Sequence, residues 1–247
     1  MLICVIMYAE ISAFTKWRGK MTDFGYVEDN YRRLLGEIDD AACGREVTLV
    51  AVTKSGTDEE LVALASLGVT DIGENRPGEL RRRGELLRER GFAPRLHEIG
   101  QLQRNKVKYI IDDCALIHSV DSLALGVEIN RLAAARGKIQ PVLIEVNSAA
   151  EEAKGGVAAD EAEELLIALR ALPHLSVRGI MTMGPRVTDP EDIRPYFRAT
   201  RTLFDRLNEK YRFEGGGILS MGMSDSFRVA IEEGATLVRV GTRLFEK

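Results

Sequence analysis

The sequence predicts an α/β protein that folds as a single (β/α)8 TIM barrel. Short β-branched apolar runs alternate with longer helical patterns along the chain, and the alternation yields eight strands. No proline- or serine-rich linker and no change of composition divides the 247 residues, a length that suits one such domain. Alternating units of this kind also build doubly wound sheets, and the count of eight favours the closed barrel.

The first helix is expected at 26–42, where Tyr31, Leu34, Leu35 and Ile38 form an apolar stripe. The run at 47–53 is typical of a parallel strand covered on both faces. Further strands are expected at 69–72, 95–99, 115–119, 141–146, 177–181, 217–219 and 237–240. Helices between them are expected at 58–67, 77–90, 104–111, 122–135, 159–171, 193–212 and 225–233. We expect the first helix to fill the gap left because no helix follows the last strand.

Composition indicates an ordinary soluble globular protein, since 45% of the residues are hydrophobic and 29% are charged. The net charge of −4 is not the basic footprint of a nucleic-acid-binding domain. The basic run at 81–83 is interspersed with acidic residues, so we interpret it as a solvated helix face. These features predict neither nucleic-acid nor membrane binding.

Three cysteines, Cys4, Cys43 and Cys114, form no C-x-x-C pair, which favours a reducing cytoplasm over a disulfide framework. The histidines are not at metal-ligand spacing, so no metal site is predicted. Residues 1–8 are apolar but too few to span a bilayer. Because Met21 precedes a plausible helix start, we expect residues 1–20 to be an N-terminal extension and residues 21–247 to form the barrel domain.

Lys54 directly follows the first predicted strand. Functional groups of such barrels lie at the carboxyl ends of the strands, so this side chain should lean over the barrel mouth. Partial desolvation and nearby cations there would favour the neutral amine, which can attack an aldehyde. A solvated lysine at the start of a loop, or the Schiff-base lysine of a cofactor-free aldolase, would occupy the same position.

The loops after the last two strands predict a phosphate site. Ser220–Asp225 offers hydroxyls and a glycine before a helix start, and Gly241–Thr242 follows the next strand. Ser224 with Asp225 could equally be an ordinary N-cap. Arg239 lies inside the last strand, where a buried charge needs a partner, either a carboxylate across the barrel or an acceptor on a ligand.

Eight short motifs carry a specific resemblance, in order around the barrel. They are at 49–54, 72–75, 97–106, 118–121, 154–156, 178–181, 220–225 and 238–242. With these motifs the chain resembles the YggS/PROSC family of pyridoxal phosphate homeostasis proteins, which is related to the barrel domain of alanine racemase. The similarity runs from about Tyr31 to Phe245.

The resemblance implies that the chain binds pyridoxal 5′-phosphate (PLP) and forms an internal aldimine at Lys54. It places Ser220, Met223, Ser224, Gly241 and Thr242 in the segments that hold the phosphate. It further implies that Arg239 faces the pyridine nitrogen and that Asn75 lines the pocket. A permanently charged donor keeps that nitrogen unprotonated and weakens the ring as an electron sink, which suits a holder of the cofactor.

The chain departs from the family at Glu98, where an aromatic residue is usual, and at 55–57, where bulkier residues are commoner. His97 and Asn105 belong to a pocket-side signature to which we assign no role.

The resemblance to alanine racemase does not extend to its second domain, which supplies a tyrosine as the opposite base. Two-base racemisation needs an acid/base group on each face of the substrate. No tyrosine of the chain lies at a predicted strand end. We therefore expect a vitamin B6 carrier without catalytic residues and with negligible racemase activity. The alternatives are a PLP-dependent amino-acid racemase of weak or specialised activity and a cofactor-free enzyme acting on a sugar phosphate. Expected partners are PLP and apo PLP-dependent enzymes, and the expected state is a monomer.

Overall fold

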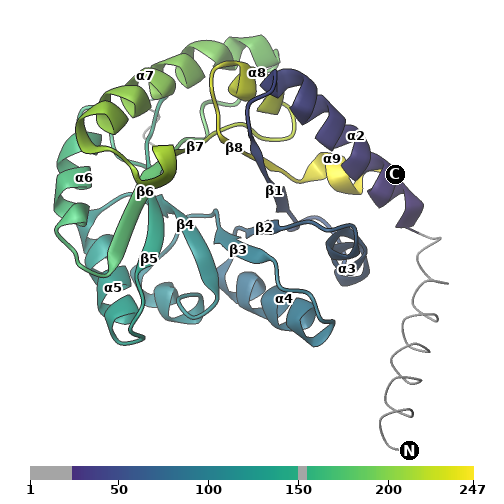
Figure 1. Cartoon of the computed structure of the whole chain (residues 1–247), viewed down its shortest axis with the longest axis horizontal. Helices are drawn as coiled ribbons and strands as arrows, with labels where there is room; N and C mark the ends of the chain where they lie inside the picture. The colour runs from purple at the N-terminus through teal and green to yellow at the C-terminus, as the bar shows by residue number, and fades with distance from the viewer. Residues whose placement is uncertain (1–23, 150–154) are drawn as a thin grey trace, which may run out of the picture.

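A computed structural model describes residues 24–149 and 155–247 and shows a closed barrel of eight parallel strands (Figure 1). Each strand pairs with the next in sequence, and β8 returns to pair with β1 through Thr48↔Leu237 to Ala51↔Val240. The strands are β1 Thr48–Val52, β2 Asp71–Glu74, β3 Arg95–Glu98, β4 Cys114–Val120, β5 Gln140–Glu145, β6 Leu175–Met181, β7 Ile218–Ser220 and β8 Leu237–Val240. The predicted (β/α)8 fold is confirmed.

Helices surround the barrel as predicted, with small shifts at their ends. The α-helices are α2 Gly25–Ala42, α3 Asp58–Ser66, α4 Pro77–Glu89, α5 Leu123–Ala134, α6 Ala162–Arg170, α7 Arg194–Tyr211, α8 Phe227–Glu232 and α9 Thr242–Phe245. Short 3₁₀ segments are η2 Arg104–Tyr109, η3 Pro190–Ile193 and η4 Glu214–Gly216. The helix predicted at 104–111 is present as the shorter 3₁₀ segment η2 in place of an α-helix.

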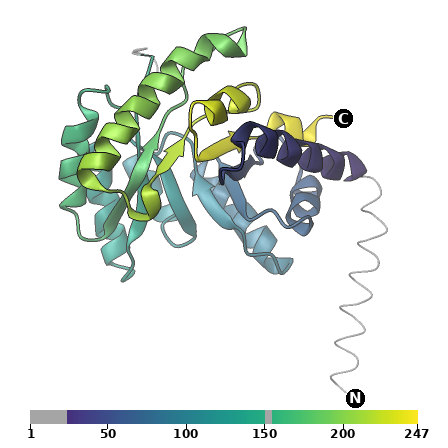
Figure 2. The same ribbon diagram turned by 45° about the horizontal axis from the view of Figure 1, so that its top comes forward.

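The helix before β1 covers the seam where the barrel closes. Helix α2 packs against α8 and α9 (Figure 2). Asn30 donates from Nδ2 to the Glu246 carbonyl at 2.7 Å, and Arg243 forms a two-pronged ion pair with Glu37. A helix does follow the last strand, which the sequence did not predict, but α9 is only four residues long. Helix α2 therefore does most of the covering at this seam.

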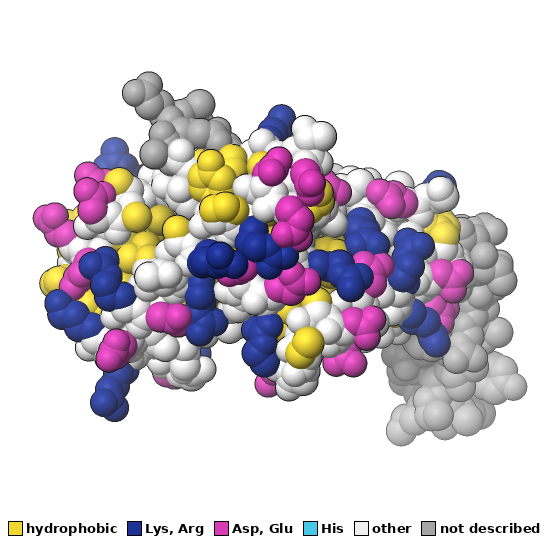
Figure 3. Space-filling model, turned by 90° about the horizontal axis from the view of Figure 1, so that it is seen from above, with side chains coloured by type: hydrophobic (Ala, Val, Ile, Leu, Met, Phe, Trp, Pro, Cys, Tyr) yellow, Lys and Arg dark blue, Asp and Glu magenta, His cyan; other side chains and the backbone are white. Residues whose placement is uncertain are grey.

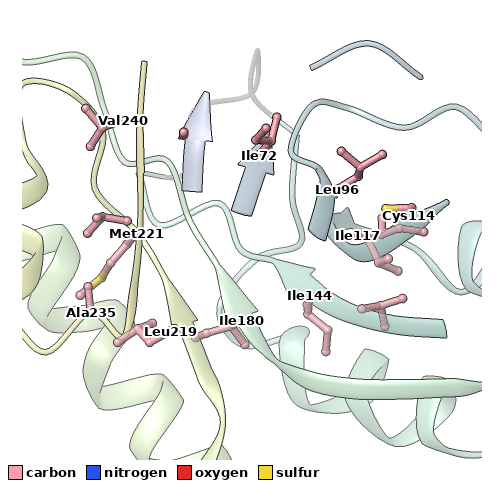
Figure 4. Packing of buried hydrophobic residues seen from close by; sticks show 14 of the residues in the cluster. Ile72, Leu96, Cys114, Ile117, Ile144, Ile180, Leu219, Met221, Ala235 and Val240 are labelled. Carbon is pink, nitrogen blue, oxygen red and sulfur yellow. The ribbon is translucent and has the colours of Figure 1, made fainter. Parts of the chain in front are cut away.

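Two apolar clusters result from the alternation of side chains along each strand. Residues pointing outward pack under the helices in the larger cluster, which includes Ile72, Ile117, Ile144, Ile180 and Val240 (Figure 4). The smaller cluster fills the barrel interior with Val50, Leu116, Leu143, Met181 and Leu237. Because Val238 and Val240 point outward, Arg239 between them points into the barrel.

Basic and acidic side chains are interspersed on the face shown in Figure 3. Arg194 at the start of α7 forms ion pairs with Glu191, Glu232 and Glu233. Within the described ranges, no helix combines the length and apolarity needed to cross a membrane. The predicted extension at residues 1–20, and Lys154 in one of the resemblance motifs, lie outside the described residues.

Candidate functional site

Lys54 occupies a tight turn immediately after β1, and its side chain is exposed. The turn closes through a hydrogen bond from the Gly56 amide to the Thr53 carbonyl at 2.9 Å. Arg83, from α4, donates to the Thr53 carbonyl through Nη1 and to the Gly56 carbonyl through Nη2 at 2.8 Å. One guanidinium therefore holds both ends of the turn that carries the lysine.

Arg83 is itself buried, with 6% of its surface exposed, and its Nη1 lies 2.9 Å from Oε1 of Glu74. Burial raises the pKa of Glu74, while a hydrogen bond from Thr53 and the charge of Arg83 oppose the rise. The interpretation of residues 81–83 as a solvated face is thus wrong for Arg83. The helical spacing in the sequence could have indicated that Arg83 is buried, because Leu80, Gly84 and Leu87 lie on the same helix face and are buried.

The ends of β1, β2, β7 and β8 bring the predicted cofactor residues together. Asn75 follows β2, which pairs with β1 through Val52↔Gly73. Gly241 follows β8 and lies close to β1. A Cβ atom at this position would lie 2.8 Å from the Val52 carbonyl oxygen. Thr242 comes next and is exposed.

Ser224 joins the loops after β7 and β8, because its Oγ accepts a hydrogen bond from the Gly241 amide at 3.2 Å. The interpretation of Ser224 with Asp225 as an N-cap is wrong, since α8 begins at Phe227 after Ser226. Met223 in the same loop is exposed. This rim presents small and hydroxyl residues from two neighbouring loops beside Lys54.

Arg239 lies in the barrel interior with 4% of its surface exposed. It donates from Nη1 to Oγ of Ser220 at 2.6 Å and from Nη2 to the Thr182 carbonyl at 3.0 Å. Arg239 forms no direct ion pair with a carboxylate of the described residues, although the charge of Glu145 on β5 acts on it across the barrel. Burial lowers the pKa of Arg239 to about 10, against the opposing charge of Glu145. A buried cation in this position favours an electron-rich ligand atom as its acceptor.

The other residues of the predicted site lie on either side of the barrel wall. Ser220 is fully buried, and its hydroxyl contacts Arg239 and His118. His97 is also buried in the interior, whereas Asn105 lies exposed on η2. The sequence did not predict the contact of His118 with Ser220, because it depends on the alignment of strands far apart in the chain.

Two buried carboxyl groups lie at the carboxyl ends of β3 and β5. Glu98 is fully buried, accepts a hydrogen bond from the Gly100 amide at 3.3 Å, and has no partner for Oε2 among the described residues. Burial raises its pKa to about 8. Burial also raises the pKa of Glu145, beside a small pocket lined in part by Ser148 and Thr182, to about 7.

We expect Glu98→Gln to stabilise the protein at alkaline pH. Because the folded pKa of about 8 exceeds the ordinary value of 4.5, the folded state holds a proton that the unfolded state releases, and stability falls between these values as pH rises. Glutamine does not titrate and so removes this loss. The unfolding free energy of Glu98→Gln relative to the wild type should therefore rise by about 3 kcal/mol from pH 5 to pH 8. Urea unfolding at both pH values measures it.

The matched control is Glu89→Gln, which alters an exposed carboxyl group on α4. Its effect on stability should not change over the same pH interval. A Glu98→Gln effect that is equally constant would contradict the assignment of a buried, protonated carboxyl group.

Comparison with known proteins gives a consistent result. The family described as "Alanine racemase, N-terminal domain" matches residues 23–246. A pyridoxal phosphate homeostasis protein of Aquifex aeolicus is 44% identical over 197 residues, covering 80% of this chain and 85% of that protein. One of Helicobacter pylori is 34% identical, covering 81% and 88%.

Solved structures are similar over the same region. PipY of Synechococcus elongatus with PLP bound has a TM-score of 0.78 and 27% identity, covering 89% of this chain and all of that chain (100%). An alanine racemase of Clostridium difficile has a TM-score of 0.69 at 19% identity. The match covers 89% of this chain and 60% of the racemase, which indicates a shared barrel fold.

Proposed function

Because the chain belongs to the family of pyridoxal phosphate homeostasis proteins, we propose that it binds PLP at the barrel mouth and acts in vitamin B6 homeostasis or PLP supply. The observation that carries the proposal is the buried guanidinium of Arg239, which forms no direct ion pair with a described carboxylate, in a barrel whose rim bears Lys54. A PLP-bound relative of the same fold supports it.

The residues present fit the three polar parts of PLP. Bound PLP would supply an aldehyde able to react with a lysine amine, a phosphate that needs N–H and O–H donors, and a ring nitrogen that accepts a hydrogen bond. Lys54 supplies an exposed amine at the rim. Ser224 and Thr242 supply hydroxyl donors in adjoining loops, which the hydrogen bond from the Gly241 amide to Ser224 holds together.

Arg239 supplies the donor for the ring nitrogen, and Asn75 and Met223 complete the wall of the site. The hydroxyl of Ser220 is already engaged by Arg239 and His118, so we assign Ser220 to the support of Arg239 in preference to direct phosphate contact.

A carrier role suits this site better than racemisation. The described tyrosines, Tyr26, Tyr31, Tyr109, Tyr196 and Tyr211, lie on helices or on η2 outside the barrel wall. Tyr26, for example, donates to Glu60 of α3, and Tyr211 to Glu163 of α6. The described residues therefore offer no tyrosine as a second base opposite Lys54. The exposure of Lys54 also leaves the anchor open to solvent and to a recipient, and we propose a cytoplasmic monomer that delivers PLP to apo PLP-dependent enzymes.

The proposal is tested by adding PLP to the purified protein and recording its visible absorption. We expect a new absorption band that saturates at one PLP per chain. Borohydride reduction followed by peptide mass analysis should then place the added mass on the peptide that contains Lys54. A featureless titration, or trapping spread over surface lysines, would refute the proposed function.

A further inference from the structure

A continuous line of hydrogen-bonded side chains crosses the barrel interior. Nε2 of His97 lies 2.8 Å from Oδ1 of Asp71, and Nδ1 of His97 lies 2.9 Å from Nε2 of His118. Nδ1 of His118 lies 3.0 Å from Oγ of Ser220, which accepts from Nη1 of Arg239 at 2.6 Å. We call these five residues the interior chain. They come from β2, β3, β4, β7 and β8.

The interior chain is enclosed along its whole length, because none of its five members exposes more than 4% of its surface. One end, Asp71 with His97, borders a cavity of about 200 Å³ at the amino ends of the strands. The other end is Arg239, the donor proposed for the ring nitrogen. The chain therefore connects the floor of the barrel with the cofactor site.

The hydrogen-bonding roles of the two ends of the interior chain are fixed, and His118 between them is neutral. Arginine can only donate, so Ser220 accepts from Arg239. Burial alone would raise the pKa of Asp71, but hydrogen bonds from His97, Arg95 and Thr70 hold it well below its ordinary value, so Asp71 is an ionised acceptor. Burial in the barrel interior, with the charge of Arg239 nearby, lowers the pKa of His118 far below its usual range, so this ring is neutral.

When each ring carries one proton, a single arrangement satisfies every link. His97 donates from Nε2 to Asp71 and accepts at Nδ1 from Nε2 of His118. His118 in turn accepts at Nδ1 from the hydroxyl of Ser220. Each group then donates toward the floor, and the oxygen of Ser220 keeps its lone pairs for Arg239.

We propose that His97 and His118 are positioning residues for PLP, which fix the hydroxyl of Ser220 and thereby the guanidinium of Arg239. This inference rests on the proposed function for the identity of the ligand. Its physical basis is that a serine hydroxyl rotates freely unless its proton has a partner. With the proton held by His118, the oxygen stays available to Arg239, whose long side chain is otherwise costly to hold in one orientation.

The tautomers of the histidines test the interior chain in the PLP-free protein. Nitrogen-15 NMR of labelled histidine at pH 8 distinguishes the Nδ1–H from the Nε2–H form. We expect His97 and His118 to carry the proton on Nε2. His174 is the internal control, because its Nδ1 lies 3.1 Å from the Lys138 carbonyl and must therefore carry the proton there. An Nδ1–H form of His118 would reverse the chain and overturn the proposal.

Matched serine variants test the effect on PLP. Ser220→Ala removes a link of the interior chain. Ser119 follows His118 on β4, and Ser119→Ala removes a buried hydroxyl that has no hydrogen-bond partner among the described residues. We expect about a tenfold rise in the Kd for PLP with Ser220→Ala and no change with Ser119→Ala. His118→Asn, which keeps an acceptor near the Nδ1 position, should bind more tightly than His118→Leu.

The outcomes separate the two proposals. If the wild type binds PLP and Ser220→Ala binds it equally well, the positioning role fails and the proposed function stands. If the wild type binds no PLP, both fail.

Discussion

Lys54→Ala is expected to abolish covalent capture of PLP altogether. The side chain follows β1 at the rim where the loops after β7 and β8 meet, and it supplies the proposed amine. Without that amine, the visible band should disappear, and borohydride should fix no mass on the chain. Residual PLP would be held through phosphate and ring contacts alone, and dialysis would remove it. Absorption spectra and intact mass after reduction measure both effects.

The control is Lys210→Ala, which removes an exposed lysine on α7 that pairs with Glu163. It should leave the band and the trapped mass unchanged. Because Lys54 is exposed, Lys54→Ala should unfold at the wild-type urea concentration, so that a lost band cannot be attributed to misfolding. Retention of the band in Lys54→Ala would exclude this lysine as the anchor.

Arg83→Met is expected to lower the free energy of unfolding by about 4 kcal/mol. The variant leaves Glu74, which is 3% exposed, without its cationic partner, and it removes the donor shared by the Thr53 and Gly56 carbonyls. The same loss should loosen the turn that holds Lys54 and weaken PLP capture. Urea unfolding and PLP titration give the two readouts separately.

Two further variants separate charge from position. Arg82→Met changes the adjacent, exposed arginine, whose ion pairs with Asp58 and Glu79 are solvated and should contribute less than about 1 kcal/mol. Adding Glu74→Gln to Arg83→Met removes the unpaired carboxylate and should restore much of the stability. It should not restore PLP capture, because the turn still lacks its guanidinium. Equal effects of Arg82→Met and Arg83→Met would contradict the structural role of Arg83.

The barrel was predictable because its signals are local. Alternating apolar runs and helical stripes identify strands and helices within a few residues, and β8 was placed at its observed bounds, 237–240. The helix predicted at 104–111 proved to be the shorter 3₁₀ segment η2. Prediction failed where the partner of a charge depends on packing, as for Arg83, which faces the turn after β1. The serine and carbonyl that Arg239 contacts were not predicted either.

The interior chain shows why such contacts escape a reading of the sequence. Its members come from five strands, and each link depends on the register between them. His97 and His118 were visible as residues, but nothing in their spacing indicates that their rings meet in the barrel. Only the closed sheet brings them into one line with Asp71, Ser220 and Arg239.

The pairing of β1 with β8 has a consequence for how the protein is made. Thr48 and Leu237 become neighbours only after nearly the whole chain has left the ribosome, so closing the ring is a non-local and late event in folding. Lys54 belongs to the beginning of the chain, and Arg239, Gly241 and Thr242 belong to its end. Nascent chains that stop short of β8 therefore cannot assemble this site, and acquisition of the cofactor has to wait until the barrel has closed.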